Sequence, residues 1–199
     1  MPRSSPAHLA EVRERILAGA ERAFRAGGYR GASIPAIAAE AGVSVGLIYR
    51  YFRSKEELFL AVCEERTEAQ MNELAALLGP MRDTRQRLET AIDFFVRSLA
   101  EQGWGAIVIQ ALAEADRNPR LRDMLIRLTE QERGFAAMFI REAIAGGEIS
   151  PDVDIEALSL AVAMLLHGAV AHQAERGEAW DPDGVARAIS VLLERALGG

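Results

Sequence analysis

The chain has 199 residues; half of them are hydrophobic, 26% are charged, and the mean hydropathy is +0.03. These values are typical of a water-soluble folded protein and exclude a disordered or fibrous chain, and the single cysteine, Cys63, excludes an intramolecular disulfide. The net charge of −6 argues, taken alone, against a polyanionic partner.

The start of the chain shows no apolar segment of an export signal, and the longest nearly apolar run, residues 157–171, is too short to span a bilayer. We therefore expect no membrane association and, with one unpaired thiol, a cytoplasmic location. Residues 1–55 hold nine Lys or Arg against four Asp or Glu, whereas residues 56–199 hold 14 against 25. A basic head on an acidic body favours attraction to phosphate, although chance fluctuation over a short segment is an alternative explanation.

Apolar residues recur with a helical period almost throughout, which predicts an all-α protein of about nine helices. The first helix is expected at residues 8–26. Its apolar face consists of Val12, Ile16, Ala20 and Phe24. Gly27 and Gly28 follow it as a C-terminal stop.

The second and third helices are expected to be short. Ser33 caps the second, which tolerates Pro35 in its first turn because the missing N–H would have no partner there. Residues 41–43 form a turn, and Ser44 caps the third helix, which runs to about Tyr51.

The fourth helix is expected to be long, because the capping box SKEE at residues 54–57 opens it and the Gly-Pro pair at residues 79–80 ends it. Later helices are predicted to start at the N-caps Asp83, Asn118 and Asp181. The separators between the remaining helices are Gly103, the loop of residues 146–154, and Gly177.

Residues 33–55 carry the pattern of a helix-turn-helix. Two short helices that cross steeply need a small residue at their approach, a residue that tolerates positive φ at the corner, and apolar residues facing the core. These residues are Ala38, Gly42, and the set Ile37, Val43 and Ile48. In such a unit the second helix enters the DNA major groove with its N-terminal residues at the base edges. A helical hairpin with no DNA partner has the same spacing and stays an alternative.

Polar and cationic side chains gather on and after the predicted recognition helix. Tyr49 and Tyr51 offer hydroxyl groups to phosphates, and Arg50 reaches a phosphate or a guanine edge. Phe52 is expected to be buried. Lys55, the only lysine of the chain, lies where the unpaired N–H groups of helix four favour an anion; a solvated charge paired with a nearby Glu is the alternative.

A longer motif joins these helices in unbroken order: Ile16, Ala20, Phe24, Gly28, Tyr29, Ser33, Ile37, Ala38, Ala41, Gly42, Val43, Ser44, Gly46, Ile48, Tyr49, Tyr51, Phe52, Ser54, Lys55, Glu57 and Leu58. Over residues 12–62 it resembles the N-terminal domain of the TetR (tetracycline repressor) family of transcriptional regulators. Residues 147–168 are similar to the family's variable C-terminal domain. The resemblance implies a homodimeric repressor of a near-palindromic operator, released by a small-molecule effector. It also implies a DNA-binding domain at residues 1–54 and a helical ligand-binding and dimerisation domain at residues 55–199.

The resemblance implies which residues contact DNA. It places the phosphate contacts at Ser33, Tyr49, Tyr51 and Lys55. It places the base contacts at Ser44, Val45, Gly46 and Arg50. Two positions depart from the family pattern, because Pro35 lacks the polar side chain often found there and Val45 offers a base only an apolar contact with a thymine methyl group.

The predicted eighth helix is apolar nearly all round, so it must be buried on two sides. One side is expected to meet its own bundle, and the other to form a four-helix interface with a second subunit together with the ninth helix. The expected interface residues are Leu158, Val162, Leu165, Leu166, Val170, Val185, Ile189 and Leu192. An effector cavity, with plain core as the alternative, is expected at Phe94, Phe95, Trp104, Val108, Phe135, Met138, Phe139, Met164 and His167.

Two other classes of function compete with DNA binding. The sequence GVSVG at residues 42–46 matches the nucleophile elbow of hydrolases, but an elbow needs a strand before its serine and none is predicted, so no enzyme is expected. His167 and His172 point about 140° apart on an ideal helix, which argues against a metal site, and no cofactor is expected. An all-α adaptor that does not bind DNA leaves the basic head and residues 33–55 unexplained.

Overall fold

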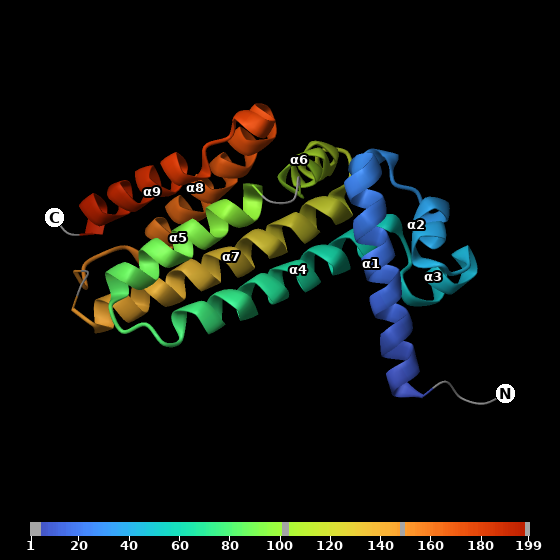
Figure 1. Ribbon diagram of the computed structural model, residues 1–199, viewed down its shortest axis with the longest axis horizontal. Coiled ribbons are helices and arrows are strands. Elements are labelled where there is room, and N and C mark those ends of the chain that lie inside the picture. The colour runs from blue at the N-terminus through green and yellow to red at the C-terminus, as the bar shows by residue number, and fades with distance from the viewer. Residues whose placement is uncertain (1–4, 101–103, 148–149, 198–199) are drawn as a thin grey trace. The chain divides into compact units, whose positions relative to one another are not determined.

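The computed structural model describes residues 5–100, 104–147 and 150–197, and within these ranges the chain is helical and contains no strand (Figure 1). The all-α prediction is confirmed. The helices are α1 (Pro6–Gly31), α2 (Ile34–Ala41), α3 (Val45–Tyr51), α4 (Lys55–Leu78), α5 (Thr84–Ala100), α6 (Trp104–Ala115), α7 (Pro119–Ala145), α8 (Ile155–Arg176), the 3₁₀ turn η1 (Gly177–Ala179) and α9 (Pro182–Leu197).

The chain forms two compact units. Unit 1 comprises Met1–Ala69 and Ile107–Met124, and unit 2 comprises Gln70–Ala106 and Leu125–Gly199. Three helices, α4, α6 and α7, contribute residues to both units. Unit 1 therefore holds the three N-terminal helices together with the first part of α4, most of α6 and the start of α7.

The core of unit 1 is built on the predicted apolar face of α1, whose four residues are each at most 6% exposed. The ring of Phe24 packs edge-on against Phe59 of α4, with centroids 5.1 Å apart, and Phe59 in turn contacts Tyr29. The first helix differs from the prediction at its end. Its backbone kinks at Gly28, where φ is +66°, but helical structure resumes and continues to Gly31.

Most predicted helix starts are confirmed by hydrogen bonds. The N-caps Ser33, Ser44 and Ser54 each accept a bond from the backbone N–H three residues on, at 3.2 to 3.3 Å. Asp83, Asn118 and Asp181 do the same in later helices. One detail of the capping box differs, since Glu57 accepts from the backbone N–H of Arg53 instead of that of Ser54. Gly177 ends α8 as predicted, and Gly103 lies outside the described residues.

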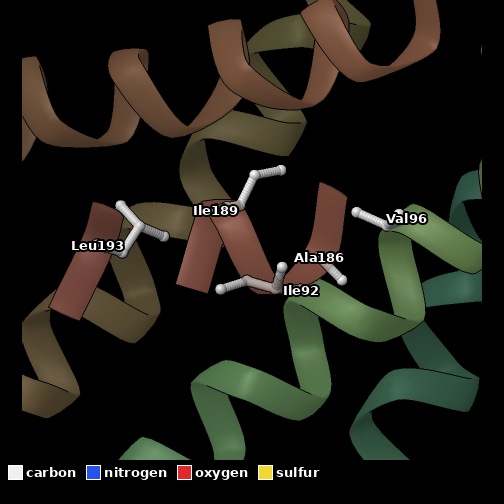
Figure 2. Close-up of a cluster of buried hydrophobic side chains, with 5 residues drawn as sticks. All are labelled: Ile92, Val96, Ala186, Ile189 and Leu193. Carbon is white, nitrogen blue, oxygen red and sulfur yellow. The ribbon is translucent and has the colours of Figure 1, made fainter. Parts of the chain in front are cut away.

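Two apolar clusters form the core of unit 2. Figure 2 shows the first, in which α5 and α9 bring together Ile92, Val96, Ala186, Ile189 and Leu193. The second joins Leu74 and Leu78 of α4 to Ala91 of α5. Around this second cluster lie four phenylalanines in successive edge-to-face contacts, with centroids 5.2 to 6.3 Å apart: Phe94, Phe95, Phe135 and Phe139.

The apolar run at residues 157–171 lies within α8, which occupies the predicted span between Asp154 and Gly177. With 22 residues and a mean hydropathy of 1.5 in its most apolar window, α8 meets the length and composition required of a membrane-spanning helix. Only 17% of that window is buried in the subunit. Two ion pairs nevertheless fix α8 to α7, one between Glu156 and Arg133 and one between His167 and Glu132. Contiguous exposed apolar surface of this kind marks a site of interaction with another protein or with a membrane.

Candidate nucleic-acid interface

The helix-turn-helix forms as predicted, because each part of the turn satisfies the backbone of the next. Gly42 ends α2 in the left-handed region, with φ of +63°, and the N–H of Val43 then reaches back 3.0 Å to the carbonyl of Ala38. Ser44 begins α3 three residues after the end of α2. Ile37 and Ile48 are fully buried, so both short helices are held by their inner faces.

The outer face of α3 is exposed to solvent at the positions assigned to base contacts, and at Tyr49, which is assigned to a phosphate. Val45 is 37% and Tyr49 53% exposed, and Gly46 and Arg50 are also exposed. Tyr51 is half-buried, and Phe52 is only 4% exposed, as expected. The seven-residue helix thus separates the residues that pack from those that can meet a ligand.

Ser33 and Ser44 are exposed N-caps, and their hydroxyl oxygens already accept backbone N–H groups. Because a serine hydroxyl has one donor as well as two acceptor sites, each can cap its helix and still donate to DNA, Ser33 to a phosphate and Ser44 to a base edge. Lys55 lies differently, because it is half-buried and its ammonium donates to two backbone carbonyls at the end of α1. Burial lowers the pKa of Lys55, while the carboxylates of Glu56 and Glu114 act in the opposite direction.

Residues of α1 that the sequence did not single out position this motif. Arg15 donates to the carbonyls of Ala41 and Gly42, at 3.4 and 3.2 Å, and so supplies a cation at the C-terminus of α2. A Cβ atom on Gly19 would lie 2.6 Å from backbone atoms of Ala41, so α1 and α2 touch at a glycine. Arg22 bridges to Glu40 at 3.2 Å. The partners in these contacts between α1 and α2 lie 18 to 27 residues apart in the sequence, so a local sequence pattern does not predict them.

The residues predicted to line an effector cavity do not share one environment. The four phenylalanines form the aromatic cluster of unit 2. Met138 and Met164 are 42% and 65% exposed, Val108 is half-buried and belongs to unit 1, and the side chain of Trp104 lies outside the described residues. An open groove of about 610 Å³ between α5 and α9 is lined by other residues, which are mostly charged: Arg85, Glu89, Asp93, Arg97, Asp183, Ala186, Arg187, Ser190 and Val191.

His167 faces Glu132 of α7, with Nε2 3.2 Å from the carboxylate oxygen. This hydrogen bond raises the pKa of His167 above the ordinary value of 6.5, and burial opposes the rise only in part. A raised folded-state pKa means that the pair stabilises the fold below the unfolded value and loses this contribution as pH rises through the folded value.

We therefore expect an NMR titration of the His167 ring to give a pKa above 6.5, and Glu132→Gln to lower it. The titration of His167 in the wild-type protein serves as the reference. An unchanged His167 titration in Glu132→Gln would show that the pair does not form in solution.

The residues predicted at a subunit interface fall into two groups. Leu158, Val162, Val185 and Ile189 pack in or against the α5–α9 cluster of their own unit. Leu165 and Leu192 are 36% and 56% exposed, and Leu166 and Val170 are half-buried. The exposed side of α8 is a continuous stripe of apolar and small residues, called here the α8 stripe: Ala157, Leu160, Ala161, Met164, Leu165, Gly168 and Ala171.

The hydrolase interpretation of residues 42–46 does not fit the structure. The residues before Ser44 form helix α2, not a strand. The hydroxyl oxygen of Ser44 caps α3, so this serine does not lie on the strand-to-helix turn that a nucleophile elbow requires. Among the residues that the structure describes, no group of three or more His, Cys, Asp or Glu side chains gathers as a metal site would require.

Similarity to known proteins covers both parts of the chain. The family model described as "Bacterial regulatory proteins, tetR family" matches residues 16–62, and that described as "Tetracyclin repressor-like, C-terminal domain" matches residues 80–192. The chain is 32% identical over 165 residues to the HTH-type transcriptional regulator UidR of Escherichia coli (strain K12), covering 80% of each protein. It is 30% identical over 182 residues to the HTH-type transcriptional repressor AcnR of Corynebacterium jeikeium, covering 88% of each.

Two solved structures show the same fold. The transcriptional regulator FadR from Bacillus subtilis in complex with stearoyl-CoA superposes with a TM-score of 0.79 at 21% identity, over 90% of this chain and 96% of that one. Salmonella enterica GusR gives a TM-score of 0.75 at 24% identity, over 98% of each chain. The likeness extends through both units, beyond the helix-turn-helix.

Proposed function

This chain belongs to the TetR family of bacterial regulatory proteins, whose members are transcriptional regulators, and we propose that it represses transcription by binding a near-palindromic operator as a homodimer. The DNA part of the proposal rests on the two faces of α3. Its outer face is exposed, and Ile48 on its inner face is fully buried. Residues 1–54 supply DNA binding, and residues 55–199 supply effector binding and dimerisation.

In the proposed complex α3 lies in the major groove. Arg50 faces a base edge or a phosphate, and Val45 and Gly46 approach the bases closely because neither has a long side chain. The hydroxyls of Ser33, Tyr49 and Tyr51 donate to phosphates on either side. In a two-fold dimer, half-sites are read one helical turn apart, at roughly 34 to 36 Å.

A second copy of the chain is the proposed partner of the α8 stripe. The stripe recurs at helical spacing from Ala157 to Ala171 of α8, and Val191 and Leu192 of α9 are exposed as well. Two copies that pair these helices would bury apolar surface that is otherwise in water, in the arrangement of a four-helix interface. Of the residues predicted at the subunit interface, Leu165 and Leu192 are exposed in the single chain and can make this contact.

A small molecule is the proposed effector, bound in the helical body near the aromatic cluster. The stearoyl-CoA held by the related fold of FadR supports this proposal. Effector and operator would then oppose each other reciprocally, with a coupling free energy of about 1 to 3 kcal/mol, as is typical of linked sites.

Binding to the DNA next to its own gene, measured by fluorescence anisotropy across a salt series, tests the proposal. We expect affinity to fall steeply as salt rises, and Lys55→Ala to reduce the slope of log K against log salt by about 0.9, the value for one phosphate contact. Arg50→Ala is expected to relax sequence preference by about 1 to 3 kcal/mol of discrimination.

Arg127→Ala is the matched control, because it removes an exposed cation from α7, outside the helix-turn-helix. It should leave both the slope and the sequence preference unchanged. The repressor assignment would be lost if the wild-type protein showed no salt-dependent binding to any DNA.

A further inference from the structure

The kink in α1 is occupied by a side chain from α6. At Gly28 the backbone takes a φ of +66°, and a Cβ atom there would lie 2.3 Å from Oε1 of Gln110. The same oxygen accepts the backbone N–H of Tyr29 at 3.0 Å. Glycine is favoured at position 28 by the positive φ, and the Gln110 amide fills the space beside it that a side chain would otherwise take.

The backbone carbonyl of Tyr29, the residue whose N–H bonds to Gln110, holds Lys55. The carbonyl of Tyr29 accepts from Nζ of Lys55 at 2.8 Å, and that of Ala32 accepts at 3.2 Å. The ammonium also lies 4.6 Å from the centroid of the Tyr29 ring, a cation–π distance. An ammonium has three N–H donors, so two hold Lys55 in place and one is left for a phosphate.

Further contacts of α6 and α7 surround this arrangement. Arg30 forms an ion pair with Glu114, one turn beyond Gln110 on α6. Asn118, the N-cap of α7, donates to Glu56 at 3.2 Å, next to Lys55. All these residues belong to unit 1, so the DNA-binding helices are fixed to a part of α6 that is 81 or more residues away in the sequence.

We propose that Gln110 is a positioning residue for DNA binding: its amide oxygen holds the backbone N–H of Tyr29, and the carbonyl of the same residue, in the next peptide group, aims the Lys55 ammonium at a phosphate. The inference rests on the proposed DNA-binding function.

Gln110→Met tests this chain of contacts, because methionine keeps the length of the side chain and removes the acceptor. We expect affinity for the operator to fall about fivefold and the salt slope to fall by about 0.9, as in Lys55→Ala. The double variant Gln110→Met/Lys55→Ala should bind no more weakly than Lys55→Ala alone, because both changes act on one contact. Gln110→Glu keeps an acceptor and should restore the slope.

The single lysine supplies a readout that needs no DNA. Selective isotope labelling of lysine gives one side-chain NMR signal, and we expect the pKa of Lys55 to rise toward its ordinary value in Gln110→Met, because the loosened ammonium gains water. Gln131→Met, an exposed change on α7, is the control and should alter neither measurement.

The outcomes separate this inference from the proposed function. If the wild-type protein binds DNA but Gln110→Met leaves the salt slope unchanged, or if its effect simply adds to that of Lys55→Ala, the inference is overturned and the repressor assignment stands. Absence of DNA binding by the wild-type protein overturns both. Circular dichroism of each variant excludes unfolding as the cause of a lost slope.

Discussion

Replacing Gly19 with alanine is expected to destabilise the protein by about 2 kcal/mol and to weaken operator binding at least tenfold. The added methyl group would lie 2.6 Å from backbone and Cβ atoms of Ala41, none of which can rotate away. Overpacking of this kind costs about 1 to 3 kcal/mol, more than the 0.5 to 1 kcal/mol that alanine gains over glycine in a helix. The displaced α2 would carry the turn and α3 out of register with the groove.

Urea unfolding followed by circular dichroism, together with DNA-binding anisotropy, measures both effects. Gly134→Ala is the matched control, because Gly134 also lies within a helix but no neighbour lies within 4 Å of the position its Cβ would take. That variant should be more stable by about 0.5 to 1 kcal/mol and should bind DNA normally. Equal stability of the two variants would show that α1 and α2 do not touch at Gly19.

Leu160→Glu and Leu192→Glu are each expected to convert a dimer into a monomer and to reduce operator affinity by about 100-fold or more, since two half-sites must then be bound separately. Both leucines are exposed in the single chain, at 44% and 56%, so neither change opens a cavity in the core. In a two-fold dimer each new carboxylate would be buried at the interface close to its own copy, a costly arrangement.

Light scattering after size exclusion, at micromolar concentration, gives the oligomeric state. Ile126→Glu places the same charge on an equally exposed apolar residue of α7, away from the α8 stripe, and should leave the dimer intact. A wild-type monomer, or variants that remain dimeric, would remove the α8 stripe from the proposed interface.

Local signals in the sequence were sufficient for the DNA-binding motif. The serine caps and Gly42 at the corner follow from contacts within a few residues, and the structure confirms them together with the predicted burial of Phe52. In this motif the residues that define the sequence pattern are close in sequence to the residues that they contact.

The contacts that hold the motif in place were not predictable in this way. In the sequence, nothing distinguishes Gln110 from other polar residues of α6. Only the tertiary structure brings it to the kink at Gly28. Ile189 illustrates a second limit. An apolar helix face does not say whether it meets its own subunit or another, and at Ile189 the core of unit 2 takes the side chain, leaving it 7% exposed.

The residues of α3 that are needed for folding differ from those that are exposed to a ligand. Folding of this helix depends on the Ser44 cap and on the buried side chains of Ile48 and Phe52, whereas positions 45, 46, 49 and 50 point outward. A combinatorial library at these four positions would therefore sample new target sites on an unaltered scaffold. Under the proposed function, the chain offers a starting point for engineered genetic switches in which the recognised DNA is exchanged.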